Sequence, residues 1–160
     1  MEKRSGARGR GIRGRHGVLA AAGAAALALV PASAGATPGT GVTAYTVAEG
    51  SAPDGISITT DGPTDVTVRV ITIEPGGTTG WHYHEGPLLA VVVSGTLTRV
   101  LEDCSVEVST AGDTVVETPG AGHVHTGRNL GTEPVVLHAT YVVPEGSPLA
   151  TDADPPACAS

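Results

Sequence analysis

Four histidines stand in two His-x-His pairs, and they are the side chains of this sequence best suited to bind a metal. The first pair is His82 and His84, and the second is His123 and His125. Successive side chains of a β-strand point to opposite faces, so residues two apart point the same way. Imidazole nitrogens are common protein ligands of divalent transition metals. We therefore predict a site for one divalent transition metal (Fe, Mn, Ni, Zn or Cu), with His82 and His84 among its ligands.

The two stretches around these pairs resemble the two motifs of the cupins. The first motif is Gly, five residues, His-x-His, three or four residues, Glu, six residues and Gly, and it is matched by Gly76, His82, His84 and Gly95. The second motif ends in Gly-x-x-His-x-x-x-Asn, and it is matched by Gly122, His125 and Asn129. The resemblance covers residues 66–144 and is greatest to small, exported, single-domain bacterial cupins. It implies a jelly-roll barrel around a metal site in which His125 is the third ligand.

The fourth position of this site stays open. The cupin motif places a Glu at position 88 or 89, and both positions are leucine here. By strand alternation His123 shares the face of His125, so it is a fourth ligand, a residue that orients a ligand, or a proton shuttle. Glu85, Glu102 and Glu117 are candidate carboxylates, and spacing favours none of them.

The elements that must position these residues are strands. Apolar segments separated by Gly and Pro turns predict an all-β fold. The expected strands are 42–48, 55–59, 66–74, 78–84, 88–94, 96–101, 105–109, 114–117, 122–126 and 134–143. The apolar face changes parity within 66–74, which predicts a bulge or a bend there. This number of strands in one domain, residues 37–160, fits a double-sheet jelly-roll barrel, the double-stranded β-helix of the cupins.

Residues 1–36 have the pattern of a secretory signal peptide. A basic stretch with six Lys and Arg precedes the apolar run 18–30, and small residues follow it. This order is typical of a signal peptide, here cleaved after Ala34 or Ala36. We therefore expect a secreted, extracellular protein that has no membrane attachment after cleavage.

Removal of this segment makes the chain strongly acidic. Three basic and fifteen acidic residues remain, a formal charge of about −12. Such a surface repels nucleic acid and anionic membranes, so the expected partner is a small-molecule ligand or substrate. An exposed sheet edge would favour a homodimer.

Cys104 and Cys158 are the two cysteines of the chain. In an oxidising compartment an even pair most simply forms one disulfide. The bond would tie the C-terminal tail to the barrel and stabilise the fold by about 4 kcal/mol in the chain-entropy model. The alternative is a thiolate ligand or nucleophile.

The fold does not name a reaction, because unrelated functions share it. Three imidazoles with open positions can bind water, O₂ or a chelating substrate. We expect a metalloprotein that is a dioxygenase or an isomerase for a small oxygenated compound. The alternatives are a non-catalytic module that binds a metal or a small ligand, and a structural barrel whose histidine cluster holds no metal.

Overall fold

The computed structural model describes residues 39–159, so the predicted signal peptide lies outside the described residues. Within this range the chain forms nine β-strands and one short 3-10 helix. They are β1 (Thr64–Ile73), β2 (His82–Tyr83), β3 (Leu88–Ser94), β4 (Thr96–Val100), β5 (Val106–Thr110), β6 (Thr114–Glu117), β7 (Thr126–Arg128), β8 (Val135–Pro144), β9 (Thr151–Asp152) and η1 (Ala157–Ala159). None of the helical structure in the described range is long and apolar enough to span a membrane.

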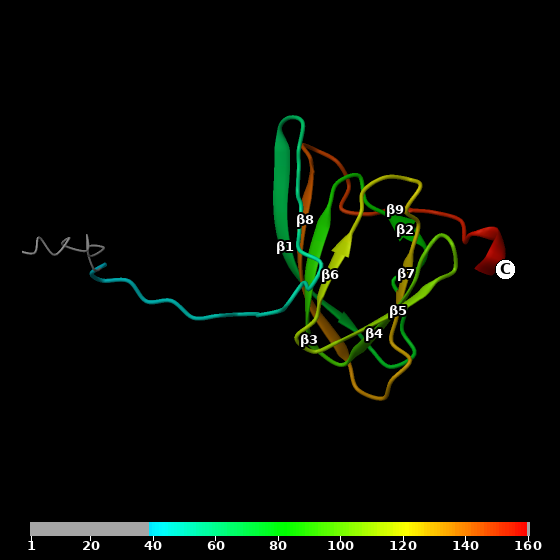
Figure 1. Cartoon of the computed structure of the whole chain (residues 1–160), viewed down its shortest axis with the longest axis horizontal. Helices are drawn as coiled ribbons and strands as arrows, with labels where there is room; N and C mark the ends of the chain where they lie inside the picture. Colours follow the sequence, from blue (N-terminus) through cyan, green and yellow to red (C-terminus); the bar gives the residue numbers. More distant parts are fainter. Residues whose placement is uncertain (1–38, 160) are drawn as a thin grey trace, which may run out of the picture. The chain divides into compact units, whose positions relative to one another are not determined.

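The strands form sheets that face each other across the core (Figure 1). One sheet has the order β1-β8-β3-β6, and a second has the order β5-β4-β7. The short pair β2-β9 continues the second sheet, because isolated bridges join Thr78 to Arg128 and His82 to His125. The pairing order differs from the chain order in both sheets, as in a jelly roll. The all-β prediction is confirmed.

The core lies between the inner faces of these sheets. Alternate residues of β8 are buried along its whole length, which is the pattern of a strand with one face in the core. The buried apolar residues are Ile73, Leu88, Ala90, Val92, Leu97, Val115, Val135, Leu137, Ala139, Tyr141 and Val143. Valine, leucine and alanine dominate this set, since the chain has no phenylalanine.

The register of the first sheet sets one row of side chains that matters for the site. Leu88 of β3 stands opposite Glu117 of β6 on one side and opposite Tyr141 of β8 on the other. Directly opposed residues of antiparallel strands point to the same face. Because Leu88 is buried in the core, Glu117 and Tyr141 also point inward.

The strands predicted at 42–48 and 55–59 are wrong. The structure has no strand at either range; the chain nearby forms only an isolated bridge between Ser51 and Asp113. The side chains of Val42, Tyr45 and Val47 are exposed. Alternation of apolar residues gives a strand only where a neighbouring strand can accept its hydrogen bonds, and these segments have no such neighbour.

The prediction of a bulge or bend within 66–74 is wrong, and the register shift lies on another strand. β1 pairs with β8 without interruption from Thr64 to Ile73, whereas β3 shifts its register between Val92 and Ser94. The change of parity in β1 has another cause: Val66, Val68 and Val70 lie on its exposed outer face. The inner face of β1 is apolar only in its second half, at Ile71 and Ile73.

The C-terminal tail is held across the second sheet. Cys104 and Cys158 form a disulfide, as the even number of cysteines predicted. Between β8 and Cys158, β9 pairs with β2, and Ala153 N–H donates to the Trp81 carbonyl over 3.0 Å. The tail therefore lies beside β2, the strand that carries His82.

Candidate metal site

Three histidines from two chain segments come together inside the barrel. His82 and His125 are joined by two backbone hydrogen bonds, of 3.0 and 2.9 Å, so their segments lie side by side. His84 follows β2 and turns its ring to the same point. Each of the three rings offers a nitrogen within 4.8 Å of the others. His84 and His125 are buried, and His82 is partly buried.

The other nitrogen of each ring is occupied by a backbone carbonyl. His82 Nδ1 donates to the Gly80 oxygen over 3.0 Å, and His125 Nδ1 donates to the His123 oxygen over 2.9 Å. His84 Nδ1 donates to the Leu149 oxygen over 2.6 Å, and Leu149 belongs to the C-terminal tail. A carbonyl bound to one imidazole nitrogen fixes the tautomer, so the lone pair of the other nitrogen is free to face a metal. The arrangement therefore leaves three Nε2 atoms as ligands.

The Nε2 atoms of His84 and His125 are buried and have no aligned hydrogen-bond partner. A buried polar atom without a partner costs about 1–3 kcal/mol and calls for an explanation. A divalent transition metal would use both lone pairs, and imidazole is a preferred ligand for such ions. The residues present therefore fit a metal ion.

Glu117 brings a carboxylate next to two of the three histidines. Its Oε2 lies 2.9 Å from His84 Nε2 and 3.2 Å from His125 Nε2. Its Oε1 accepts a hydrogen bond from Arg99 Nη1 over 3.2 Å. Arg99 is buried on β4, and its Nη2 binds Glu107 of the neighbouring strand β5. The guanidinium thus holds the Glu117 carboxylate in one orientation.

These contacts shift the proton affinities of the cluster. Burial alone would raise the pKa of Glu117, but His125, His84 and Arg99 outweigh it and hold the pKa far below its usual range. Burial lowers the pKa of His82. Burial acts in the same direction on His125, but contact with Glu117 is stronger and raises the pKa of that imidazole. The carboxylate is therefore ionised, and burial favours the neutral form of His82.

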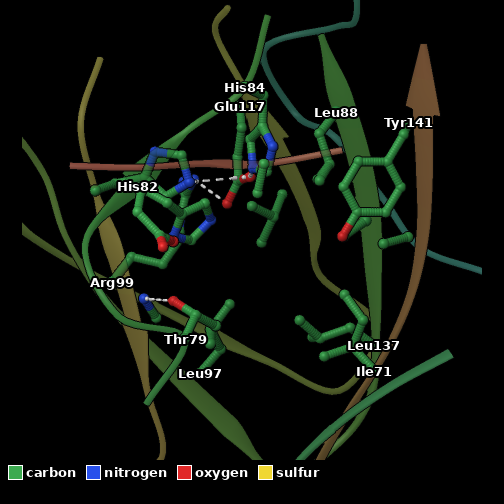
Figure 2. A pocket seen from close by; sticks show the side chains of 17 residues that line it. Ile71, Thr79, His82, His84, Leu88, Leu97, Arg99, Glu117, Leu137 and Tyr141 are labelled. Carbon is green, nitrogen blue, oxygen red and sulfur yellow. Dashed lines mark hydrogen bonds and ion pairs between the residues drawn. The ribbon is translucent and has the colours of Figure 1, made fainter. Parts of the chain in front are cut away.

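The cluster forms one wall of a cavity of about 180 Å³. Figure 2 shows His82, His84, Glu117 and Arg99 on one side of this cavity and Tyr141 on the other, with its hydroxyl directed inward. Burial raises the pKa of Tyr141, so its hydroxyl stays protonated. The rest of the lining is mainly apolar and includes Ile71, Leu88, Leu97 and Leu137.

The structure does not bring His123 into the cluster. Its side chain is exposed, and its Nδ1 lies 3.3 Å from Glu102 Oε1. The strand predicted at 122–126 begins four residues later, at Thr126. A turn comes before it, in which His123 N–H donates to the Gly120 carbonyl. Strand alternation therefore does not apply to the second histidine pair. Of the other candidate carboxylates, Glu102 pairs with His123 and Glu85 is exposed.

The sequence did not favour Glu117 over the other candidate carboxylates, and it did not identify Arg99 or Tyr141 as residues of the site. The signal for Glu117 was its place two residues after Val115 in a short apolar strand, which puts both on the inner face. Only the pairing of β3 with β6 shows that this face meets the histidines.

Comparison with known families gives a match to the central part of the chain. The model of the family described as Cupin domain (Cupin_2) matches residues 69–143. Residues 69–143 are a cupin domain. This range contains His82, His84, Glu117 and His125, and the fold is the double-stranded β-helix of the cupins. A comparison with curated proteins finds no match.

Several solved structures are similar to this cupin domain. An uncharacterised conserved protein with a double-stranded β-helix domain from Klebsiella pneumoniae is 26% identical, with a TM-score of 0.49, and the match covers 67% of this chain and 90% of that one. A cupin 2 domain-containing protein from Halorhodospira halophila is 27% identical, with a TM-score of 0.46 and coverages of 56% and 58%. The DMSP lyase DddQ from Ruegeria pomeroyi is 17% identical, with a TM-score of 0.49 and coverages of 56% and 44%. None of these likenesses is close enough to carry an activity to this chain.

Proposed function

We propose that this cupin is an exported metalloprotein that binds one divalent transition metal through His82, His84 and His125. The observation that supports it most strongly is the set of three imidazoles whose Nδ1 atoms all bind carbonyls while their ring nitrogens converge. Packing alone does not require three histidines in one tautomer around one point. The signal-peptide pattern of residues 1–36 supports export, together with the disulfide.

We further propose that the metal acts on a small oxygenated organic compound, as a dioxygenase or an isomerase would. A bound divalent metal supplies a Lewis acid and, where it is redox-active, a site for oxygen chemistry. The cavity of about 180 Å³ limits the substrate to a small molecule. Its walls are mainly apolar, and the Tyr141 hydroxyl is placed to donate a hydrogen bond to a substrate oxygen.

A non-catalytic binding module is the second candidate. The observation that favours it is the position of the tail: Leu149 binds His84, and Ala150 and Asp152 line the cavity. A tail fixed by a disulfide across the site restricts exchange of substrate and product. Such an arrangement suits retention of a metal or of one small ligand.

Three measurements test these proposals. Metal analysis of protein purified without a histidine tag should give close to one equivalent after reconstitution. Less than about a tenth of an equivalent, for any transition metal, would exclude both metal-based proposals. Where metal binds, oxygen uptake over a panel of diphenols, thiols and keto acids should detect a substrate for a dioxygenase. NMR of the same compounds in D₂O should detect proton exchange by an isomerase. No turnover in either assay would leave the binding module.

A further inference from the structure

Glu117 contacts two of the three clustered histidines, His84 and His125, although the cupin motif has its Glu at position 88 or 89. We propose that Glu117 is the fourth protein ligand of the metal, supplied by β6 in place of a carboxylate on β3. This inference rests on the proposed metal binding. It concerns a residue that lies outside both cupin motifs.

The register of the sheet explains how the carboxylate can change strands. Leu88 occupies the motif position and is Glu117's direct partner across the β3-β6 pair. Opposed residues of antiparallel strands have Cβ atoms about 4.5–5.5 Å apart on one face. A carboxylate at either position therefore reaches the same inner point. Leu88 itself is 4% exposed and packs in the core.

The two oxygens of Glu117 have different surroundings. Oε1 is taken by Arg99, so the guanidinium fixes the plane of the carboxylate. Oε2 faces His84 Nε2 at 2.9 Å and His125 Nε2 at 3.2 Å. Ligands about 2.1 Å from one ion and at right angles to each other stand about 3.0 Å apart. The observed separations are those of neighbouring ligands around one ion.

A metal ion accounts for this contact without protons on the two Nε2 atoms. When only Nδ1 carries a proton, as metal ligation requires, His84 and His125 turn Nε2 lone pairs toward a Glu117 oxygen. Neither Nε2 has an aligned hydrogen-bond partner. Acceptors at such distances repel each other unless a cation lies between them. A metal ion bound by all of them removes the repulsion.

The competing explanation is that Glu117 only neutralises the buried Arg99. Glu107 offers a matched control, because it is the other carboxylate on the same guanidinium and does not line the cavity of about 180 Å³ that all three clustered histidines line. Glu117→Gln removes the charge but keeps an oxygen for Arg99. Glu117→Asp keeps the charge but withdraws the oxygens by one carbon–carbon bond, about 1.5 Å.

The experiment is a titration of tag-free, metal-free protein with Co²⁺, followed by calorimetry and by the visible absorption of the bound ion. Wild type, Glu117→Gln, Glu117→Asp and Glu107→Gln are compared, and circular dichroism checks their folding. We expect both Glu117 variants to bind Co²⁺ at least about tenfold more weakly than Glu107→Gln, with an altered spectrum, because a ligand is lost. If Glu117→Gln does not fold, Glu117→Asp carries the test.

Two results would overturn the inference. One is affinities and spectra of both Glu117 variants that match those of Glu107→Gln within about twofold. The other is a Glu117→Asp variant that binds like wild type while Glu117→Gln is weakened, because this would show a role for the charge alone. Failure of the wild type itself to bind Co²⁺ or any other transition metal would instead exclude the proposed metal function.

Discussion

Asn129 shows how a residue of the second motif acts on the site without touching it. Its side chain is fully buried, and its amide nitrogen donates to the carbonyls of Ile73 and Glu133, each over 2.8 Å. Its side-chain oxygen accepts from Gly131 N–H over 3.0 Å. Asn129 thus fixes the chain that follows β7. This strand begins at Thr126, directly after His125.

We expect Asn129→Asp to destabilise the protein by about 2 kcal/mol or more, because a carboxylate oxygen would face two carbonyl oxygens in the core. Urea unfolding of the metal-free protein measures this change. Asp154→Asn, which makes the reverse exchange in the exposed tail, is the control and should have little effect. An Asn129→Asp variant as stable as wild type would show that the buried amide does not hold this turn.

The histidines differ in their expected importance for the metal. His84→Ala removes a buried ligand, so we expect it to weaken metal binding by more than about 100-fold. Loss of a residue that only hydrogen-bonds a ligand typically weakens binding by about 10- to 100-fold. His123→Ala should change the affinity little, because that side chain is exposed and pairs with Glu102. Calorimetric titration of the two variants provides the comparison. Equal losses would mean that His123 moves into the site when metal binds.

Residue types and spacing were enough to find two of the three clustered histidines and to name the third through a motif. They were not enough to choose among the carboxylates. The distance from Glu117 to His84 depends on which strands pair and in what register, and neighbours in the sequence do not determine that. The exposed position of His123 likewise depends on a turn whose extent the spacing of two histidines does not reveal.

At the scale of elements, strands with many apolar residues were the most predictable. The observed bounds of β3 and β6 are those expected from the sequence, because each is a continuous or alternating run that ends at a turn. The expected strands at 42–48 and 55–59 failed, since alternation cannot supply a pairing partner. Strand existence was therefore predictable in the core and not at the N-terminal side of the domain.

The C-terminal tail is the element that closes over the histidines, and the disulfide holds its end. Replacing both Cys104 and Cys158 by serine should lower the free energy of unfolding by about 4 kcal/mol in the chain-entropy model. Hydrogen exchange of the Ala153 amide, which is bonded to the Trp81 carbonyl, should become faster. Amides in the middle of β8 serve as the internal control and should keep the protection expected from global stability. Unchanged exchange at Ala153 relative to these amides would show that β9 holds the tail without the bond.

The turn between β5 and β6 predicts a dependence of stability on pH. The backbone and side chain of Thr110 both donate to Asp113 Oδ2, over 2.6 and 3.0 Å, and these bonds lower the pKa of Asp113. A lowered pKa in the folded state gives stability above the unfolded pKa, and this stability is lost as pH falls through the folded value. Asp113→Asn should therefore be less stable than wild type at pH 6, with a smaller difference at pH 2. Urea midpoints at the two pH values test this, and a difference independent of pH would contradict it.

At the scale of the whole molecule, the larger sheet exposes apolar side chains on the outer face of its edge strand, although the chain is acidic. β1 is an edge strand of ten residues, and Val66, Val68 and Val70 on its outer face are each more than 60% exposed. A long edge with free backbone groups and apolar side chains readily pairs with another chain. The strand also carries one acid and one base, Asp65 and Arg69, at equal distances from Thr67.

This spacing predicts a symmetric dimer through β1. Two copies of β1 that pair antiparallel about Thr67 place Asp65 of each copy opposite Arg69 of the other, and Val66 opposite Val68. Such cross-strand pairs each contribute about 0.2–1 kcal/mol, and the backbone ladder adds to them. We therefore expect wild type to sediment as a dimer, and Arg69→Glu to shift it toward monomer by placing like charges opposite each other.

Reversal of both charges tests the register itself, because Asp65→Lys combined with Arg69→Glu restores opposite charges across the pair and should restore the dimer. Val68→Lys should disrupt the dimer, whereas Val108→Lys should not. Val108 is similarly exposed, at 61% against 69% for Val68, and lies on β5, the edge strand of the other sheet. Analytical ultracentrifugation of the set distinguishes the possible outcomes. A wild-type monomer would exclude the dimer, and a dimer that survives Arg69→Glu and Val68→Lys but not Val108→Lys would place the contact on β5.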